Sequence, residues 1–244
     1  MGTITRRIRY TPAPGENTGN LAIFRVTGGD VEWIEGSGYE DGWMVWSGNS
    51  NSVYGVGYKA EDSFTDTENH WAKEYIGYAA SRGLISGVAA DTFAPDAAIT
   101  RAEFIMALAR LSGEDVSGYT ASSFVDVDNG TAAMPYIEWA YRNGIVAGTG
   151  SNRFSPDAAI TREQMAVMLW NYAKAAGLAM PVLREYEPFT DDGMVSSWAG
   201  EAVGAVVRAG IIVGRDGGRF APRSSATRAE ATVVLKRFME YVVD

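Results

Sequence analysis

The stretch AITRAEF, residues Ala98–Phe104, contains the start signal of a helix and one residue that the signal does not explain. Thr100 and Glu103 form the pattern of a capping box, in which each side chain bonds the backbone amide of the other residue. Arg101 then occupies the first helical position, where a cation at the positive end of the helix dipole costs about 0.3–1 kcal/mol. The arginine therefore needs a reason beyond helix formation.

The same stretch occurs twice more, as AITREQM from residue 159 and as ATRAEAT from residue 226. The arginines Arg101, Arg162 and Arg228 are separated by 61 and 66 residues. Each belongs to a longer shared pattern of Phe-x-Asp, an apolar helical stretch ending in glycine, Phe-x-Pro and the Thr-Arg box. The glycine and the arginine are 18 residues apart in every copy, which indicates three structural repeats.

Each repeat predicts a helix, a loop and a second helix. In the first repeat, apolar residues from Trp71 to Ala80 recur at helical spacing. Gly83 follows as a C-terminal glycine in the left-handed conformation, and the capping box starts the second helix. The other two repeats follow the same plan.

Residues 1–60 have a different composition, rich in Gly, Trp, Tyr and Val. The runs LAIFRV, VEWIE, GWMVW and VYGVGY within this segment predict strands that are separated by turns. The stretch TITRR near the start looks like the Thr-Arg box, but Pro12 and Pro14 follow it, so no helix is expected there. We expect a thin β-rich segment that is the tail of a larger surface domain.

Composition excludes several classes of function. The net charge is −9, from 21 Lys and Arg against 30 Asp and Glu, which is a poor surface for nucleic acid. The absence of cysteine excludes disulfides and thiolate metal sites, and His70 is the only histidine, so neither a histidine triad nor a metal centre is expected. We also expect no cofactor. No apolar run reaches the roughly 20 residues that a membrane-spanning helix needs.

The start of the chain lacks the apolar core of a signal peptide. The sequence is therefore either cytoplasmic or an internal piece of an exported protein.

The three units, with Phe-x-Asp, Trp-Ala, Gly, Phe-x-Pro-[Asp/Arg] and Thr-Arg-Ala-Glu in order, resemble surface-layer homology (SLH) motifs over roughly residues 61–244. The resemblance implies a bacterial module, outside the cell at the wall or S-layer, that anchors proteins without a covalent bond. Its implied partner is an anionic secondary cell-wall polysaccharide, often carrying pyruvate ketals. The alternative within the family is a self-assembling S-layer protein, whose copies contact one another.

The resemblance also completes the fold prediction. We expect a mainly α protein, with three tandem helix–loop–helix repeats in a pseudo-threefold bundle, preceded by the small β-rich segment. The expected boundaries are 1–60 for the β-rich segment and 61–118, 119–183 and 184–244 for the repeats.

An anionic ligand would explain the arginine at the start of each box helix. A pyruvate ketal carries a carboxylate, which a guanidinium can hold with two parallel hydrogen bonds beside the free amides of a helix N-terminus. In the family, this arginine lies in the binding groove. The candidate glycan-binding residues are the arginines, aspartates, tryptophans and glycines that recur in the repeats: Arg101, Arg162, Arg228, Asp66, Asp126, Asp191, Trp71, Trp198, Gly87, Gly148 and Gly214.

Each candidate also has a structural interpretation. The aspartates are positioned to neutralise the arginines in internal salt bridges, and the two roles can coexist. The tryptophans fit either the core or a platform for sugar rings, and the glycines fit turns or a close approach to the ligand. The second repeat departs from the pattern, because Ala132 aligns with the tryptophans and Gln164 replaces the glutamate of the box.

Catalysis is not expected in this chain. Paired carboxylates can hydrolyse glycosides, but the pairs present, such as Asp191 with Asp192, lie in predicted turns and do not recur in an informative way.

Overall fold

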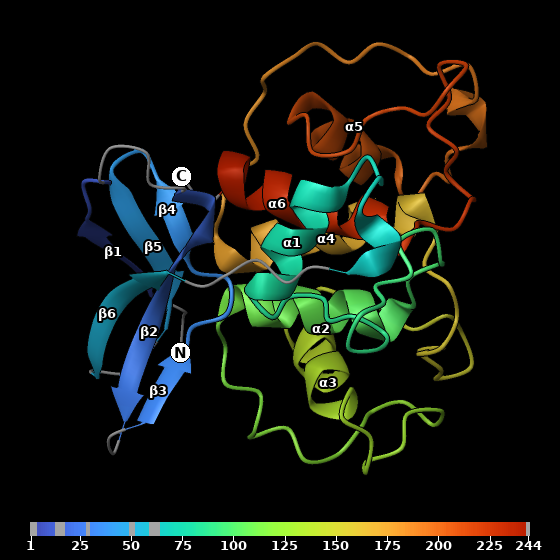
Figure 1. Cartoon of the computed structure of the whole chain (residues 1–244). Coiled ribbons are helices and arrows are strands. Elements are labelled where there is room, and N and C mark those ends of the chain that lie inside the picture. Colours follow the sequence, from blue (N-terminus) through green and yellow to red (C-terminus); the bar gives the residue numbers. More distant parts are fainter. Residues whose placement is uncertain (1–3, 13–17, 28–29, 49–51, 59–63, 243–244) are drawn as a thin grey trace. The chain divides into compact units, whose positions relative to one another are not determined.

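The computed structural model describes residues 4–12, 18–27, 30–48, 52–58 and 64–242 (Figure 1). These residues contain six α-helices and six β-strands, and the strands form two three-stranded antiparallel sheets. The expectation of a mainly α chain is therefore wrong, since the segment before the repeats contributes two sheets of its own.

The first sheet has the strand order β1-β5-β4 and the second has the order β3-β2-β6. The strands are β1 (Thr5–Arg9), β2 (Leu21–Thr27), β3 (Asp30–Trp33), β4 (Gly38–Glu40), β5 (Trp43–Ser47) and β6 (Val53–Tyr58). Four of them, β2, β3, β5 and β6, confirm the strands expected from the apolar runs. The pattern misses β1 because three of its five residues are arginine, and it misses β4 because this strand has only three residues.

A small apolar core fills the space within the β-rich segment. Leu21 and Ile23 of β2 pack with Met44 and Trp46 of β5, and all four side chains are buried. Half-buried tyrosines and aliphatic residues surround this cluster. The alternation of inward and outward residues along the strands supplies these contacts.

The helices occur in three successive pairs, one pair in each repeat. They are α1 (Lys73–Ser81) and α2 (Arg101–Ser112), α3 (Met134–Arg142) and α4 (Arg162–Ala176), and α5 (Gly200–Arg208) and α6 (Arg228–Val242). Short 3-10 helices span Thr18–Asn20, Thr65–Thr67 and Asp192–Met194. The first helix of each pair is followed by a glycine with φ near 70°: 68° at Gly83, 68° at Gly144 and 72° at Gly210. The left-handed glycine expected after the first helix is confirmed.

The second helix of each pair begins at its capping box. In the first repeat, Glu103 N donates to Thr100 Oγ1 over 3.1 Å and Thr100 N donates to Glu103 Oε2 over 2.8 Å. The same reciprocal pair of bonds occurs at the starts of α4 and α6. The box thus fixes where each of these helices begins.

The chain separates into two compact units. The first comprises Met1–Pro95 and Ala107–Asp115, and the second comprises Asp96–Met106 and Val116–Asp244. The first half of α2 therefore belongs to the second unit and its remainder to the first. The boundaries expected for the individual repeats stay a prediction.

In the first unit, one buried arginine joins the β-rich segment to the first repeat. Arg82, directly after α1, donates to the carbonyl oxygens of Ser37 at 2.8 Å, Gly19 at 2.8 Å and Leu21 at 3.1 Å. Asn143 and Ala209 occupy the corresponding positions in the other two repeats, directly before their own left-handed glycines. The arginine is thus a feature of the repeat that adjoins the β-rich segment.

In the second unit, the residues just before the three box helices form a closed ring of backbone hydrogen bonds. Ile99 N donates to Ala226 O over 3.1 Å, Ala226 N donates to Ile160 O over 2.9 Å, and Ile160 N donates to Ile99 O over 3.0 Å. The ring closes only when all three box segments are present, and each segment leads directly into its helix, α2, α4 or α6.

Candidate functional site

The aspartate of each Phe-x-Asp motif binds two successive backbone amides. Asp126 Oδ1 accepts from Phe154 N at 2.8 Å, and Oδ2 accepts from Ser155 N at 2.9 Å. The same two bonds connect Asp66 with residues 93 and 94, and Asp191 with residues 220 and 221. The repeated carboxylate therefore holds the Phe-x-Pro loop of its own repeat.

The loop needs this support because its backbone is strained. The residue between Phe and Pro has φ of 57° at Ala94, 59° at Ser155 and 57° at Ala221. Residues other than glycine rarely adopt this region, and a following proline restricts the backbone further. Two amide bonds to one carboxylate stabilise the turn against that strain.

The hydrogen bonds from the loop amides also change the pKa of the aspartates that accept them. Burial alone would raise the pKa of Asp66 and of Asp126, but the hydrogen bonds from the two loop amides outweigh it and lower both pKa values. Both carboxylates are therefore charged at neutral pH.

The three box arginines are buried, with exposed fractions of 4% for Arg101, 3% for Arg162 and 3% for Arg228. Arg101 Nε donates to Phe154 O over 2.9 Å, and Arg162 Nε donates to Phe220 O over 2.8 Å. Each of these two guanidinium groups also lies over the ring of the same phenylalanine, at 4.6 Å and 5.2 Å. The arginine of one repeat thus reaches the Phe-x-Pro loop of the next.

The expected arginine–aspartate salt bridges do not form at Arg101 or Arg162 within the described residues. Instead, Arg162 Nη1 pairs with Glu230 Oε1 at 2.9 Å, and Arg228 Nη1 pairs with Glu103 Oε1 at 2.7 Å. Asp126 acts on Arg101, and Asp191 on Arg162, through space. Burial lowers the pKa of Arg101, and the charge of Asp126 opposes that shift.

The tryptophans lie on the surface, so the alternative that places them in the core is wrong. Trp71 is 65% exposed and Trp198 is 56% exposed, and each stands just before a helix rather than in its apolar face. The ring of His70 lies 5.3 Å from that of Trp71. Both indoles are therefore exposed to solvent, and the stacking of a sugar ring on them stays a prediction.

The three candidate glycines have a packing reason to be glycine. A Cβ atom at Gly148 would lie 2.6 Å from Arg153 O, and one at Gly87 or Gly214 would lie 2.5 Å or 2.7 Å from the phenylalanine ring of the local Phe-x-Asp motif. These distances are too short for a side chain. Close packing accounts for all three positions, and contact with a ligand stays a prediction.

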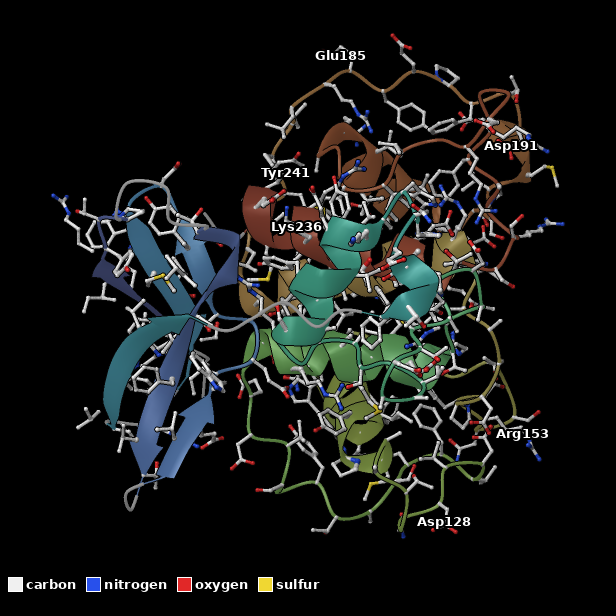
Figure 2. The ribbon with its side chains drawn as sticks, viewed as in Figure 1. Asp128, Arg153, Glu185, Asp191, Lys236 and Tyr241 are labelled. Carbon is white, nitrogen blue, oxygen red and sulfur yellow. The ribbon has the colours of Figure 1, made fainter. Side chains whose placement is uncertain are left out.

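The structure connects two of the candidate arginines to candidate aspartates through a shared phenylalanine. Phe154 links Arg101 to Asp126, and Phe220 links Arg162 to Asp191, so each of these sites spans two repeats. The sequence analysis did not single out these phenylalanines, although their recurrence in Phe-x-Pro is a visible signal. Asp191 and Arg153 lie on loops outside the box helices (Figure 2).

Two further classes of site find no support in the part of the chain that the structure describes. No described helix combines the length and the apolar character required to cross a membrane. Nor do three or more His, Asp or Glu side chains gather there in a way that suits a metal ion.

The model of the S-layer homology domain matches residues 63–105, 123–166 and 188–232. The chain is 34% identical over 224 residues to exoglucanase XynX of Acetivibrio thermocellus, covering 87% of the chain and 20% of that protein. It is 33% identical over 193 residues to the amylopullulanase of Thermoanaerobacterium thermosulfurigenes, covering 75% of the chain and 10% of that protein. It is 31% identical over 173 residues to S-layer protein EA1 of Bacillus anthracis, covering 70% of the chain and 19% of that protein.

The chain thus spans a fifth or less of the length of these relatives. The matched segments coincide with the three units that carry the Phe-x-Asp motif and the Thr-Arg box, and together they cover more than half of the sequence. The chain therefore belongs to the S-layer homology domain family, of which it carries three tandem motifs.

Proposed function

We propose that this chain anchors a bacterial surface protein to the cell wall by binding a wall polysaccharide without a covalent bond. The relatives are named as hydrolases in two cases and as an S-layer protein in a third, and each shares only a small part of its length with this chain. A region common to proteins with such different names fits attachment better than catalysis. The chain accordingly works outside the cell, at the wall.

The observation that carries the proposal is the buried guanidinium at the junction of two repeats. Arg101 reaches from the start of α2 to the loop of the second repeat, where Asp126 holds the backbone in place. A fixed guanidinium beside a helix N-terminus suits an anion and selects a planar one such as a carboxylate. A polysaccharide that carries pyruvate ketals provides such a group on a sugar ring.

Exposed aromatic rings support a sugar ligand. Trp71 and Trp198 present apolar faces at the surface, and the C–H face of a sugar packs well against an indole. An overall charge of −9 does not oppose an anionic polymer at these sites, because screening at physiological salt limits unfavourable long-range interactions to about 8 Å.

The chain itself is proposed to be a binding module rather than an enzyme. The repeated aspartates already accept two backbone hydrogen bonds each, and the box glutamates Glu103 and Glu230 already pair with arginines. Carboxylates engaged in this way are poor candidates for the acid and base of glycoside hydrolysis.

A sedimentation assay tests the anchor. The purified chain should pellet with cell walls that retain their polysaccharide and should stay in solution when that polymer has been extracted. Equal pelleting with both preparations would contradict the proposal.

The second candidate is a self-assembling structural role, favoured by the similarity to an S-layer protein. It predicts concentration-dependent assembly of the chain in the absence of any wall. Light scattering across a concentration series separates it from the anchor, which predicts no such assembly.

A further inference from the structure

The two box glutamates, Glu103 and Glu230, each perform two tasks with their two oxygen atoms. Glu103 Oε2 accepts from Thr100 N at 2.8 Å, while Oε1 pairs with Arg228 at 2.7 Å. Glu230 Oε2 accepts from Thr227 N at 2.9 Å, while Oε1 pairs with Arg162 at 2.9 Å. One oxygen caps the helix and the other neutralises a buried arginine of a different repeat.

The second repeat cannot perform both tasks, because it has Gln164 at this position. Gln164 Oε1 accepts from Thr161 N at 3.2 Å, so the capping box is complete. The other terminal group of a glutamine is an amide NH₂, which donates hydrogen bonds and accepts none. Gln164 therefore has neither a second oxygen nor a negative charge to offer an arginine.

The order of the ion pairs identifies which arginine is affected. The third repeat's Arg228 pairs with the box of the first repeat, and the second repeat's Arg162 pairs with the box of the third. The remaining combination places Arg101 beside the box of the second repeat. Backbone bonds agree, since Arg101 N donates to Ala158 O over 2.9 Å, three residues before Thr161, where that box begins.

Arg101 differs from Arg162 in how its guanidinium is satisfied. Arg162 uses all three nitrogens, with Nε on Phe220 O, Nη1 on Glu230 and Nη2 on Val213 O at 2.7 Å. In Arg101 only Nε has a hydrogen-bond partner among the described residues, which is Phe154 O. The side chain is nevertheless only 4% exposed, so a buried cation lacks a direct counter-charge.

The nearby carboxylate of Asp126 does not serve as a hydrogen-bonded counter-ion for Arg101. Burial lowers the pKa of Arg101 and the charge of Asp126 only opposes this through space, while both oxygens of Asp126 accept from the amides of Phe154 and Ser155. In the other two box pairs, a glutamate Oε1 accepts from an arginine Nη group. At the equivalent position of the second repeat, both Arg101 and the side-chain NH₂ of Gln164 offer only donors.

We propose that Arg101 and Gln164 form the principal anion-binding site of this chain, and that Gln164 creates it by leaving Arg101 without an internal counter-ion. A carboxylate borne on a sugar of the wall polymer takes the position of the missing glutamate oxygen and accepts from both side chains. Arg162 is the weaker ligand-binding arginine, because Glu230 already occupies that position. The proposal rests on the polysaccharide-binding function and assigns it a preferred site.

The test uses the full chain, purified wall polysaccharide and a pair of matched substitutions. Gln164→Glu supplies the missing counter-ion, and Glu103→Gln makes the reverse change in the first repeat; both residues support a capping box, so the helices should persist. Gln164→Glu should weaken binding about tenfold, the effect of losing one charged hydrogen bond. Glu103→Gln removes the counter-ion of Arg228, as Gln164 does for Arg101, so it should bind the polysaccharide at least as tightly as the unchanged chain.

Thermal unfolding supplies a second readout. Without polysaccharide, Gln164→Glu should melt higher than the unchanged chain, because it neutralises the buried cation. Saturating polysaccharide should then raise the Tm of the unchanged chain more than that of Gln164→Glu. A merely structural role for Gln164 would leave the shift caused by ligand the same in both.

Treatment of the polymer identifies the carboxylate. Mild acid removes pyruvate ketals, whereas carbodiimide followed by borohydride reduces the carboxyl groups of both ketals and uronic acids. The reduction should abolish the difference between the unchanged chain and Gln164→Glu, and mild acid should abolish it only where the carboxylate belongs to a ketal. A difference that survives both treatments would assign the site to another anion, such as phosphate, and overturn the proposal.

Equal binding by the unchanged chain and Gln164→Glu, or equal weakening by both substitutions, would overturn the preferred site while leaving the anchor function intact. Failure of the unchanged chain to bind the polysaccharide at all would instead overturn the anchor function itself.

Discussion

Arg101 and Asp126 hold the same residue, Phe154, by opposite ends of its backbone. The guanidinium donates to the carbonyl oxygen of Phe154 over 2.9 Å, and the carboxylate accepts from its amide over 2.8 Å. Since Arg101 comes from the first repeat and Asp126 from the second, this contact joins the repeats. Residues that are candidates for ligand binding therefore also stabilise the fold. A substitution at either position calls for measurement of both ligand affinity and the free energy of unfolding.

Replacing the two arginines by alanine should affect stability unequally. Arg162→Ala breaks a buried ion pair and should cost about 3 kcal/mol of unfolding free energy. Arg101→Ala removes one hydrogen bond to a carbonyl and no ion pair, and should cost about 1 kcal/mol. Urea unfolding at neutral pH measures both. A larger loss for Arg101→Ala would contradict the assignment of ion pairs.

The aspartate clamps should make stability fall in acid. The folded pKa of Asp126 is lowered, so its contribution is complete above the unfolded pKa of about 3.9 and is lost as the pH falls through the folded value. Asp126→Asn should be destabilised at pH 7, and its deficit should shrink below pH about 4. Urea midpoints measured across this range provide the check. A deficit that stayed constant with pH would assign the destabilisation to lost shape rather than lost charge.

Glycine in the repeat loop should be intolerant of even a methyl group. In Gly148→Ala the new Cβ would lie 2.6 Å from the backbone oxygen of Arg153, which should cost about 1–3 kcal/mol. Gly200→Ala is the matched control, because its Cβ meets nothing within 4 Å and alanine favours helix α5. The thermal midpoint should fall for the first substitution and rise slightly for the second.

The exposed tryptophans should separate binding from folding. Trp71→Ala and Trp198→Ala remove surface side chains, so the free energy of unfolding should change by less than about 0.5 kcal/mol. If the indoles support sugar rings, binding of wall polysaccharide should weaken while the melting temperature is retained. Unchanged binding by both variants would remove the tryptophans from the site.

The stability of the β-rich segment should depend on Arg82 of the first repeat. Arg82→Ala leaves the carbonyl oxygens of Ser37, Gly19 and Leu21 without their shared donor, which should cost about 3 kcal/mol for a buried charged group. Arg82→Lys should rescue this only in part, because an ammonium lacks the planar fork. Limited proteolysis should then cleave the β-rich segment first. Cleavage elsewhere at the parental rate would argue against this role.

The sequence alone was sufficient to predict the structural features that recur in each repeat. Thr100 and Gly83 recur with fixed spacing, and the position of Glu103 keeps a glutamate or glutamine that completes the capping box, so helix starts and ends could be predicted before the structure. Strand β1 could not, because its arginines follow no apolar alternation and its pairing with β5 is a long-range contact.

The site was only partly predictable for the same reason. The recurrence of arginine and aspartate pointed to loops and helix starts that the structure connects, but not to the partners, since Phe154 and Glu230 approach their arginines across repeat boundaries. The burial of the arginines is also a tertiary property, which no local pattern reveals. The substitution at Gln164 was visible in the sequence, yet its effect on Arg101 depends on the closed order of the repeats.

Calorimetric titration of the unchanged chain with purified wall polysaccharide, before and after mild acid removal of its pyruvate ketals, tests the central claim most directly. The anchor with a carboxylate-binding arginine predicts saturable binding to the intact polymer and a loss of about tenfold or more in affinity when the ketals are removed. Equal affinity for both polymers would contradict recognition of the ketal carboxylate, and the absence of binding to either would contradict the anchor itself.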